Sequence, residues 1–316
     1  SYLVLVDEAG KAYQFVDANK GIAFYTEDGS GEAGKISDLQ NVTVNSNDIF
    51  FMSFPTTGAG VKLPVAAPVT ASDEPSLKLA LNNNAPDPVT ENGKQINVLT
   101  VELAGNIDVT SIPQPDRSAT DQATINRVVY DLNGHKLTTT QQTSFSATDD
   151  VVFQNGSIEF SKVMLNDNDT PGTSSDDYED KAGASMALGE VGKLTLDNVT
   201  FTAAGSGLFV ATNAYADPDT GETDNYLTIK DSTLVIKGYF GVGTNATDSS
   251  AIVGSPKVTI EDSTITMNPD DTFGVGGMGN NKDNTALFIN VPSNVTVTGS
   301  TLTANRQAVI VRGGTL

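Results

Sequence analysis

Hydrophobic and polar residues alternate along the second half of the chain, and one short pattern returns several times. Each copy opens with an apolar residue, a threonine and another apolar residue, passes through Asn, Asp or Gly at its fifth place, and ends on an apolar residue. Alternation of this kind is typical of a β-strand with one buried face, and Asn, Asp and Gly tolerate the backbone of a bend. We therefore expect a strand, a corner and the start of a second strand in every copy. The four clear copies are Leu194–Phe201, Leu227–Leu234, Val258–Ile265 and Val295–Leu302.

A second apolar segment follows each copy at a nearly constant distance. The copies start at residues 194, 227, 258 and 295, which are 33, 31 and 37 residues apart. The length changes are therefore expected between the second segment and the next copy, on one side of a repeat architecture. The segments are Gly207–Ala214, Tyr239–Ala246, Thr272–Gly279 and Ala308–Gly314, and they align on Val210, Val242, Val275 and Val311, which lie 16, 15, 17 and 16 residues after the start of their copies.

Looser copies of the pattern precede these, at Tyr130–Leu137 and Val151–Ile158. A repeat of this size buries its apolar face only by stacking on its neighbours. The repeats are rich in β-branched residues and Thr, are punctuated by Gly, and show no helical periodicity. The sequence therefore predicts an all-β chain in which the repeats form a parallel β-solenoid.

The segment Asp131–Leu137 (Asp-Leu-Asn-Gly-His-Lys-Leu) and the repeated Val-Thr-Ile-x-Asp-Ser-Thr-Ile phrase also suggest a family. On these residues the chain resembles the right-handed parallel β-helices of the pectin lyase-like superfamily, over about residues 76–316. The resemblance implies a right-handed parallel β-helix. It implies no single activity, because that superfamily contains lyases, hydrolases, phage tailspikes and non-catalytic adhesins.

Residues 1–54 have a different pattern, which predicts a small β-rich domain that could serve as an anchoring module. A hairpin is expected around Asp7–Lys11, with Gly10 in the turn. The expected strands are Tyr2–Val6, Ala12–Val16, Ile22–Tyr25, Val42–Val44 and Ile49–Phe54.

A segment rich in Pro, Ala and Thr, residues 55–75, is predicted to be a linker. Ser72–Leu81 then has the chemistry of a helix start, with a Ser or Asp cap, Pro in the first turn and spaced leucines behind it. We expect this helix to cap the N-terminal end of the β-helix predicted for residues 76–316, where strand edges would otherwise stay open. The C-terminal end is expected to be uncapped, so that a continuing chain or a partner would cover it.

The composition excludes several classes of function. The formal net charge of the 316 residues is −21, which disfavours binding to nucleic acid or to anionic lipid. The chain has no cysteine, and therefore no disulfide framework and no thiol nucleophile. No stretch approaches the roughly 18 apolar residues of a membrane span. We expect an extracellular protein, on a virion or on a bacterial cell surface, and both locations stay open.

Candidates for catalysis are few. The single histidine, His135, lies in a predicted surface turn. The resemblance to pectinolytic hydrolases would require His-Gly and Arg-Ile-Lys motifs, and neither is recognisable. The resemblance to lyases would require Ca²⁺-binding aspartates and a basic residue acting as the base. Arg306 and Arg312 are the weak candidates for that base, and we prefer to interpret them as solvent-facing side chains.

Two sets of residues are candidates for binding. Asp217, Asp219 and Asp224 lie in an acidic loop whose oxygens could hold Ca²⁺, although the loop lacks the distal Glu of a full calcium loop and the alternative is a solvated turn. Apart from this Ca²⁺, no cofactor is expected. Tyrosines beside the insertions could stack on sugar rings, with local loop packing as the alternative. They are Tyr215, Tyr226 and Tyr239.

Asn and Asp also recur at the predicted corners, where side-chain ladders would stabilise the turns. The corner residues are Asn155, Asn198, Asp231 and Asp262. Asn213 and Asn245 align likewise in successive repeats and suggest an internal ladder.

We interpret the chain as a non-catalytic structural or binding protein, either a virion decoration protein or fibre or a bacterial adhesin, that binds a glycan. The expected partners are a capsid or surface protein that holds residues 1–54, a polysaccharide, and further copies of the chain in a homo-oligomer. The alternative is a polysaccharide lyase or depolymerase of the tailspike kind. It would require acidic residues from three successive repeats to converge on one strand face.

Overall fold

The chain divides into two compact units, Ser1–Ala67 and Pro68–Leu316. The computed structural model describes, in the larger unit, residues 70–117, 124–145, 150–161, 164–166, 178–180, 184–189, 192–212, 221, 223–246, 254–267, 284–305 and 307–313. In the smaller unit it describes the backbone of five short strands.

These five strands of the smaller unit are antiparallel. β1 (Leu5–Val6) pairs with β2 (Ala12–Tyr13), which confirms the predicted hairpin. β3 (Ala23–Glu27) pairs with β4 (Ala33–Ile36) and β5 (Phe50–Ser53). β3 and β5 confirm two further predicted strands, and β4 was not predicted. The strand expected at 42–44 lies outside the described residues.

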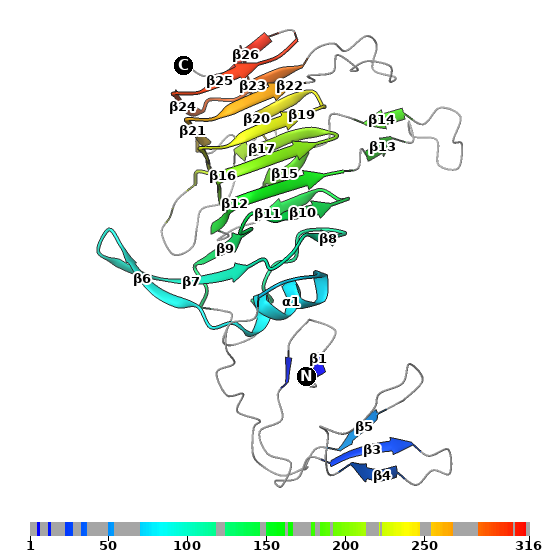
Figure 1. The fold of residues 1–316 in the computed structure, drawn as a ribbon. Helices are drawn as coiled ribbons and strands as arrows, with labels where there is room; N and C mark the ends of the chain where they lie inside the picture. Colours follow the sequence, from blue (N-terminus) through cyan, green and yellow to red (C-terminus); the bar gives the residue numbers. More distant parts are fainter. Residues whose placement is uncertain are drawn as a thin grey trace. The chain divides into compact units, whose positions relative to one another are not determined.

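The described part of the larger unit is all-β apart from one helix, and most of its strands belong to two sheets (Figure 1). Neighbouring strands in these sheets are parallel, except for the antiparallel pair β6 and β7. In the first sheet, the path β24-β21-β18-β16-β12-β9-β7-β6 is joined by five further strands. Its strands are β6 (Asp87–Glu91), β7 (Lys94–Glu102), β8 (Ile107–Val109), β9 (Arg127–Asp131), β10 (Lys136–Thr139), β12 (Asp150–Phe160), β16 (Lys193–Ala203), β18 (Tyr226–Lys230), β19 (Thr233–Ile236), β21 (Lys257–Glu261), β22 (Thr264–Met267), β24 (Asn294–Thr298) and β25 (Thr301–Thr303).

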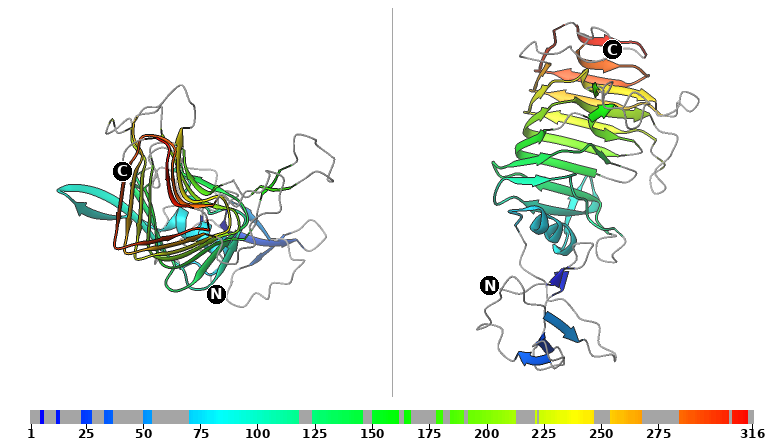
Figure 2. Two further views of the ribbon diagram at one scale, coloured as in Figure 1. Left: turned by 90° about the horizontal axis from the view of Figure 1, so that it is seen from above. Right: turned by 90° about the vertical axis from the view of Figure 1, so that its right-hand side faces the viewer.

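The second sheet runs in the order β11-β15-β17-β20-β23-β26. Seen from above, the strands of successive repeats lie over one another (Figure 2). Its strands are β11 (Thr143–Phe145), β15 (Ala184–Leu188), β17 (Ser206–Thr212), β20 (Phe240–Ala246), β23 (Thr285–Ile289) and β26 (Gln307–Val311). A small antiparallel pair, β13 (Met164–Asn166) and β14 (Tyr178–Asp180), lies apart from both sheets.

The repeated pattern sets the register of the first sheet. Leu194, Leu227, Val258 and Val295, the first residues of the four copies, are direct partners from strand to strand. The same holds for the residues after the corner, where Phe201 pairs with Leu234. The first early copy is displaced, because Tyr130 pairs with Phe153 and not with Val151.

The predicted corners within the copies of the repeated pattern have left-handed backbone, as their residue types predict. The φ angles are 59° at Asn155, 56° at Asn198, 48° at Asp231, 46° at Asp262 and 61° at Gly299. Asn, Asp and Gly are the residues that tolerate this region best, so the turn prediction is confirmed.

The second sheet corrects two predictions. The strand between β20 and β26 is β23, not the predicted Thr272–Gly279, which lies outside the described residues. Leu287 of β23 is fully buried, and its neighbours in register are Val242 and Val309. In this repeat the added residues therefore precede the second strand, which begins at Thr285.

The structure also differs from the predicted alignment of valines in the second strands. Val242 pairs with Leu208, two residues before the expected Val210. For the same reason Asn245 pairs with Ala211 and not with Asn213. Asn245 instead contacts the next repeat, where the Asn290 side chain after β23 donates to the Asn245 amide oxygen at 2.8 Å.

The core is one continuous hydrophobic cluster along the larger unit, and the inward positions of both sheets contribute to it. Aromatic rings from successive strands meet inside it. The rings of Tyr130 and Phe153 stack with centroids 4.7 Å apart, and those of Phe160 and Phe201 lie tilted at 5.6 Å. Stacked repeats of this kind stabilise one another through shared burial.

The helix α1 (Glu74–Asn83) confirms the predicted helix start. The Asp73 carboxylate accepts the Ser76 N–H at 2.8 Å, and the Ser76 hydroxyl oxygen accepts the Asp73 N–H in return. Leu77 and Leu81 are fully buried and join the core beside β7 and β8. Among the described residues no helix is long and apolar enough to cross a membrane.

Candidate functional site

The residues singled out from the sequence do not gather at one place. Asp217, Asp219, Tyr215 and Arg306 lie outside the described residues. Within the described ranges, no group of three His, Asp or Glu side chains is arranged to hold a metal ion. His135 lies in a corner of the first sheet, where its backbone N–H donates to the Leu132 carbonyl at 2.7 Å, which matches the predicted turn.

Asp224 and Tyr226 belong to one polar cluster with Lys257. The Asp224 carboxylate accepts the Ser255 N–H at 2.7 Å and lies 3.0 Å from the Lys257 ammonium. That ammonium also donates to the Tyr226 hydroxyl at 2.8 Å and lies 4.6 Å from the ring centroid. Burial alone would raise the pKa of Asp224, but the bonds from Ser255 and Lys257 outweigh it, so the pKa is lowered. The cluster ties the start of β18 to the start of β21.

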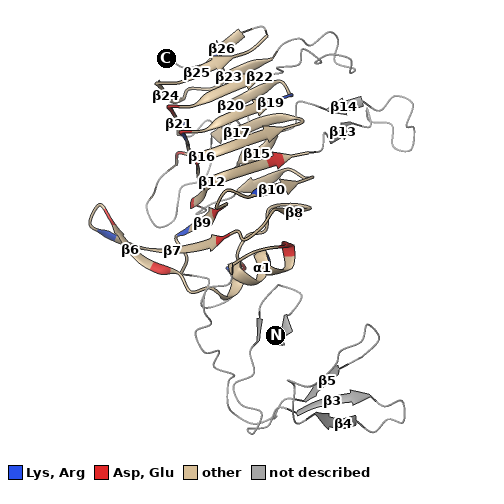
Figure 3. Cartoon of the chain, viewed as in Figure 1, with Lys and Arg blue, Asp and Glu red and all other residues tan. Residues whose placement is uncertain are grey.

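The strands of the first sheet carry charged residues of both signs (Figure 3). One column of residues in register crosses six strands and consists of Glu102, Asp131, Gln154, Asp197, Lys230 and Glu261. The Lys230 ammonium lies 3.6 Å from the Asp197 carboxylate. Glu102 and Asp131 are adjacent acids, but Gln154 separates Asp131 from Asp197, and Lys230 separates Asp197 from Glu261. The column therefore does not bring acids from three successive repeats together, as the lyase alternative requires.

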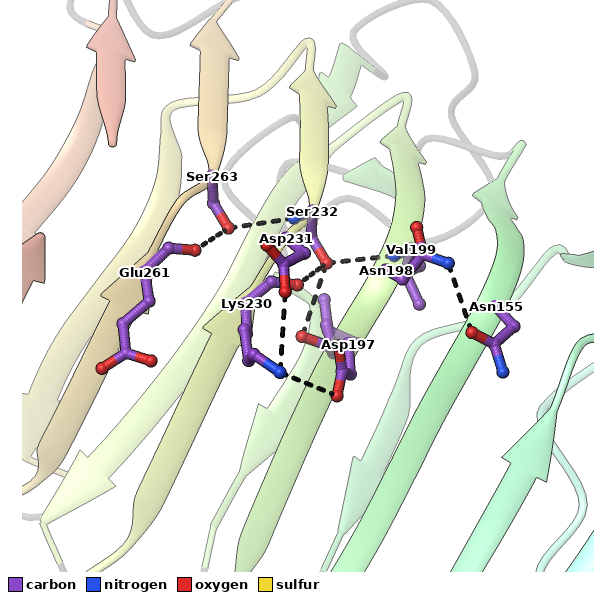
Figure 4. A network of polar contacts seen from close by, with 10 residues as sticks. Asn155, Asp197, Asn198, Val199, Lys230, Asp231, Ser232, Glu261 and Ser263 are labelled. Atoms are coloured by element: carbon purple, nitrogen blue, oxygen red, sulfur yellow. Dashed lines mark hydrogen bonds and ion pairs between the residues drawn. The ribbon is translucent and has the colours of Figure 1, made fainter. Parts of the chain in front are cut away.

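Serines tie the corners together, as Figure 4 shows. The Ser232 hydroxyl oxygen accepts the Val199 N–H at 3.0 Å, and Ser263 accepts the Ser232 N–H at the same distance. Ser300 then accepts the Ser263 N–H at 3.0 Å. Each serine also donates to the carbonyl two residues before it. The ladder is structural, and its signal in the sequence is Ser at the sixth place of three of the four copies.

The expected Asn and Asp ladder exists in part. The Asn198 side chain donates to the Asn155 amide oxygen at 3.2 Å (Figure 4). Asp231 lies instead 3.6 Å from the Lys230 ammonium. These contacts hold the corners, which agrees with the preferred interpretation of these residues as turn stabilisers.

A groove on the second sheet brings together two of the candidates, Tyr239 and Arg312. Its volume is about 260 Å³, and it crosses the three neighbouring strands β20, β23 and β26. It is lined by Tyr239, Phe240, Thr285, Phe288, Gln307, Ile310 and Arg312.

Three of the residues that line this groove are aromatic, Tyr239, Phe240 and Phe288. The Arg312 guanidinium lies 5.0 Å from the centroid of the Phe288 ring, and Phe288 pairs in register with Ile310. Phe240 folds over Gly243, where an added Cβ would come within 2.9 Å of the ring. Gly243 thus leaves the space that the Phe240 ring occupies at the edge of the groove.

Most of the groove was not found from the sequence. Its residues come together only through the register of β20, β23 and β26. The sequence pattern predicts the middle strand at Thr272–Gly279, which does not contain Phe288. The signal available in the sequence was an aromatic residue within a short apolar run, as at Phe288 in Thr285–Ile289.

Comparison with known proteins adds no name to this geometry. No family model, no curated protein and no solved structure matches the chain.

Proposed function

We propose that the chain is a non-catalytic β-solenoid scaffold that is displayed outside a cell and binds a glycan. The larger unit would be a right-handed parallel β-helix of the pectin lyase-like kind. Parallel pairing in register across successive repeats and one continuous core support this architecture. A virion or a bacterial surface would carry it, and residues 1–54 would attach it there.

The aromatic groove on the second sheet is the observation that carries the binding proposal. Small-ligand sites are usually concave and combine apolar or aromatic side chains with a few polar groups, and this groove has residues of both kinds. The partly exposed rings of Phe240 and Phe288 offer apolar contact area to a sugar ring, while Gln307 and Arg312 offer hydrogen-bond donors.

The first sheet supports a structural role. Its outer charges are partly neutralised by one another, and its corner serines bond to the backbone of the neighbouring repeat. A catalytic pair of carboxylates needs a defined separation around a bond to be cleaved. In the mixed column only Glu102 and Asp131 are adjacent acids, and Gln154 follows them, so acids from three successive repeats do not converge there.

The proposal is tested by exposing the purified chain to a panel of neutral and acidic polysaccharides, with and without Ca²⁺. Retention in affinity electrophoresis measures binding, and ultraviolet absorbance and reducing ends measure cleavage. We expect retention by at least one polymer without cleavage, lost in Phe288→Ala and kept in the control Thr233→Val on the first sheet. Cleavage of any polymer would establish the enzyme alternative, and retention by none would refute glycan binding.

A further inference from the structure

Arg312 differs from several other cations of the larger unit in its surroundings. It is exposed, it lies over the Phe288 ring, and it pairs with no carboxylate within the described part of the chain. The cation–π contact orients the flat guanidinium, and its N–H edges stay available. Other cations of the larger unit do pair with acids, namely Lys78, Arg127, Lys136, Lys230 and Lys257.

An uncompensated arginine is a notable feature in a chain with a formal net charge of −21. The planar fork of its N–H groups matches the two oxygens of a carboxylate. Hydrogen bonds to a charged group of this kind contribute more than neutral ones. The position of Arg312 at the rim of the aromatic groove therefore indicates a ligand that has both an apolar ring face and an acidic group.

The size of the groove and the charge of the whole chain limit the ligand further. A volume of about 260 Å³ lies below the usual range for drug-sized ligands, and is suited to one sugar ring. The negative field of the chain repels a polymer that carries an acid on every unit, whereas a single acid adds little repulsion.

We propose that the groove formed by Phe240, Phe288, Gln307 and Arg312 binds one terminal sugar with a single carboxylate. The ring lies against the two phenylalanines, and Arg312 takes the carboxylate. This inference rests on the glycan binding proposed above and names the class of sugar.

The test uses matched pairs of methyl glycosides, glucuronate with glucose and galacturonate with galactose, together with polygalacturonate. Affinities of the full chain are measured by ligand-observed NMR titration. In at least one of the two pairs, the acidic sugar is expected to bind about tenfold more tightly than its neutral partner, a difference in binding free energy of about 1.4 kcal/mol. Arg312→Gln should weaken binding of the acidic sugar more than binding of the neutral sugar, and so remove this preference. The control Lys94→Gln makes the same change in net charge on the β6–β7 hairpin and should have no effect.

The outcomes separate the two proposals. If no glycoside and no polymer binds, glycan binding itself is refuted. Equal affinity for the acidic and neutral sugars, or an unchanged preference in Arg312→Gln, would refute the carboxylate assignment while binding stands. Tighter binding of polygalacturonate per sugar unit than of methyl galacturonate would refute the restriction to a single acid.

Discussion

Replacing Ser232 by alanine should remove one rung of the corner ladder and leave the rest in place. The Ser232 hydroxyl accepts the Val199 N–H at 3.0 Å and donates to the Lys230 carbonyl at 2.6 Å. Val199 is 2% exposed, so water cannot easily replace the lost acceptor. A buried donor without a partner costs about 1–3 kcal/mol, and we expect the free energy of unfolding to fall by that amount.

The assay has two readouts. Urea unfolding followed by circular dichroism gives the change in stability, and amide hydrogen exchange shows where the change lies. In Ser232→Ala the Val199 amide should lose protection. In Ser263→Ala the loss should instead appear at the amide of Ser232, because in the unchanged chain that N–H donates to the Ser263 hydroxyl. The control is Thr233→Val, which removes an exposed hydroxyl that makes no hydrogen bond within the described residues.

A change in stability below about 0.5 kcal/mol, the range of ordinary surface substitutions, would refute the assignment of the ladder as structural. So would a loss of protection at the same amide in both serine variants, because the two serines accept from different residues.

Three further predictions concern the core and the polar clusters. Phe201→Ala should lower the free energy of unfolding by about 3–5 kcal/mol in urea titrations, because Phe201 is fully buried against Phe160, and a loss below 1 kcal/mol would contradict its place in the core. Gly156→Ala should destabilise by about 1–3 kcal/mol in the same assay, since the added Cβ would lie 2.4 Å from Leu132 Cβ, and an unchanged midpoint would show that this approach is not close. Asp224 has a lowered pKa in the folded chain, so its contribution to stability is complete above the ordinary pKa of about 3.9 and is lost as pH falls through the folded pKa. Unfolding measured at pH 7 and pH 3 should therefore show a smaller acid loss in Asp224→Asn than in the unchanged chain, and equal losses would contradict the role of the carboxylate.

The strands of the first sheet were predictable because their signals are local. Alternating residues set each strand, and Asn198, Asp231 and Asp262 stand where the backbone must enter the left-handed region. The helix α1 was predictable for the same reason, since Asp73, Pro75 and Ser76 carry its start within four residues.

The second sheet was harder because its register depends on contacts between distant segments. Both Thr272–Gly279 and Thr285–Ile289 are apolar enough for a strand, and only burial beside Val242 and Val309 selects the latter. The groove depends on that choice, since Phe288 belongs to the selected strand. The β6–β7 hairpin was missed although its Asn92-Gly93 turn, with φ angles of 51° and 80°, is a strong local signal.

The stacking of successive repeats in parallel register is the claim on which the account depends, and cysteine cross-linking tests it directly in a chain without natural cysteines. Thr228 and Thr259 are partners on adjacent strands, which places their Cα atoms about 4.8 Å apart, within the range of a disulfide. Thr195 and Thr259 lie two strands apart in the same column, at about 9.6 Å, which is beyond that range. The account predicts that the pair Thr228→Cys with Thr259→Cys oxidises to an intramolecular disulfide and that the pair Thr195→Cys with Thr259→Cys stays reduced. A disulfide in the second pair, or none in the first, would contradict it.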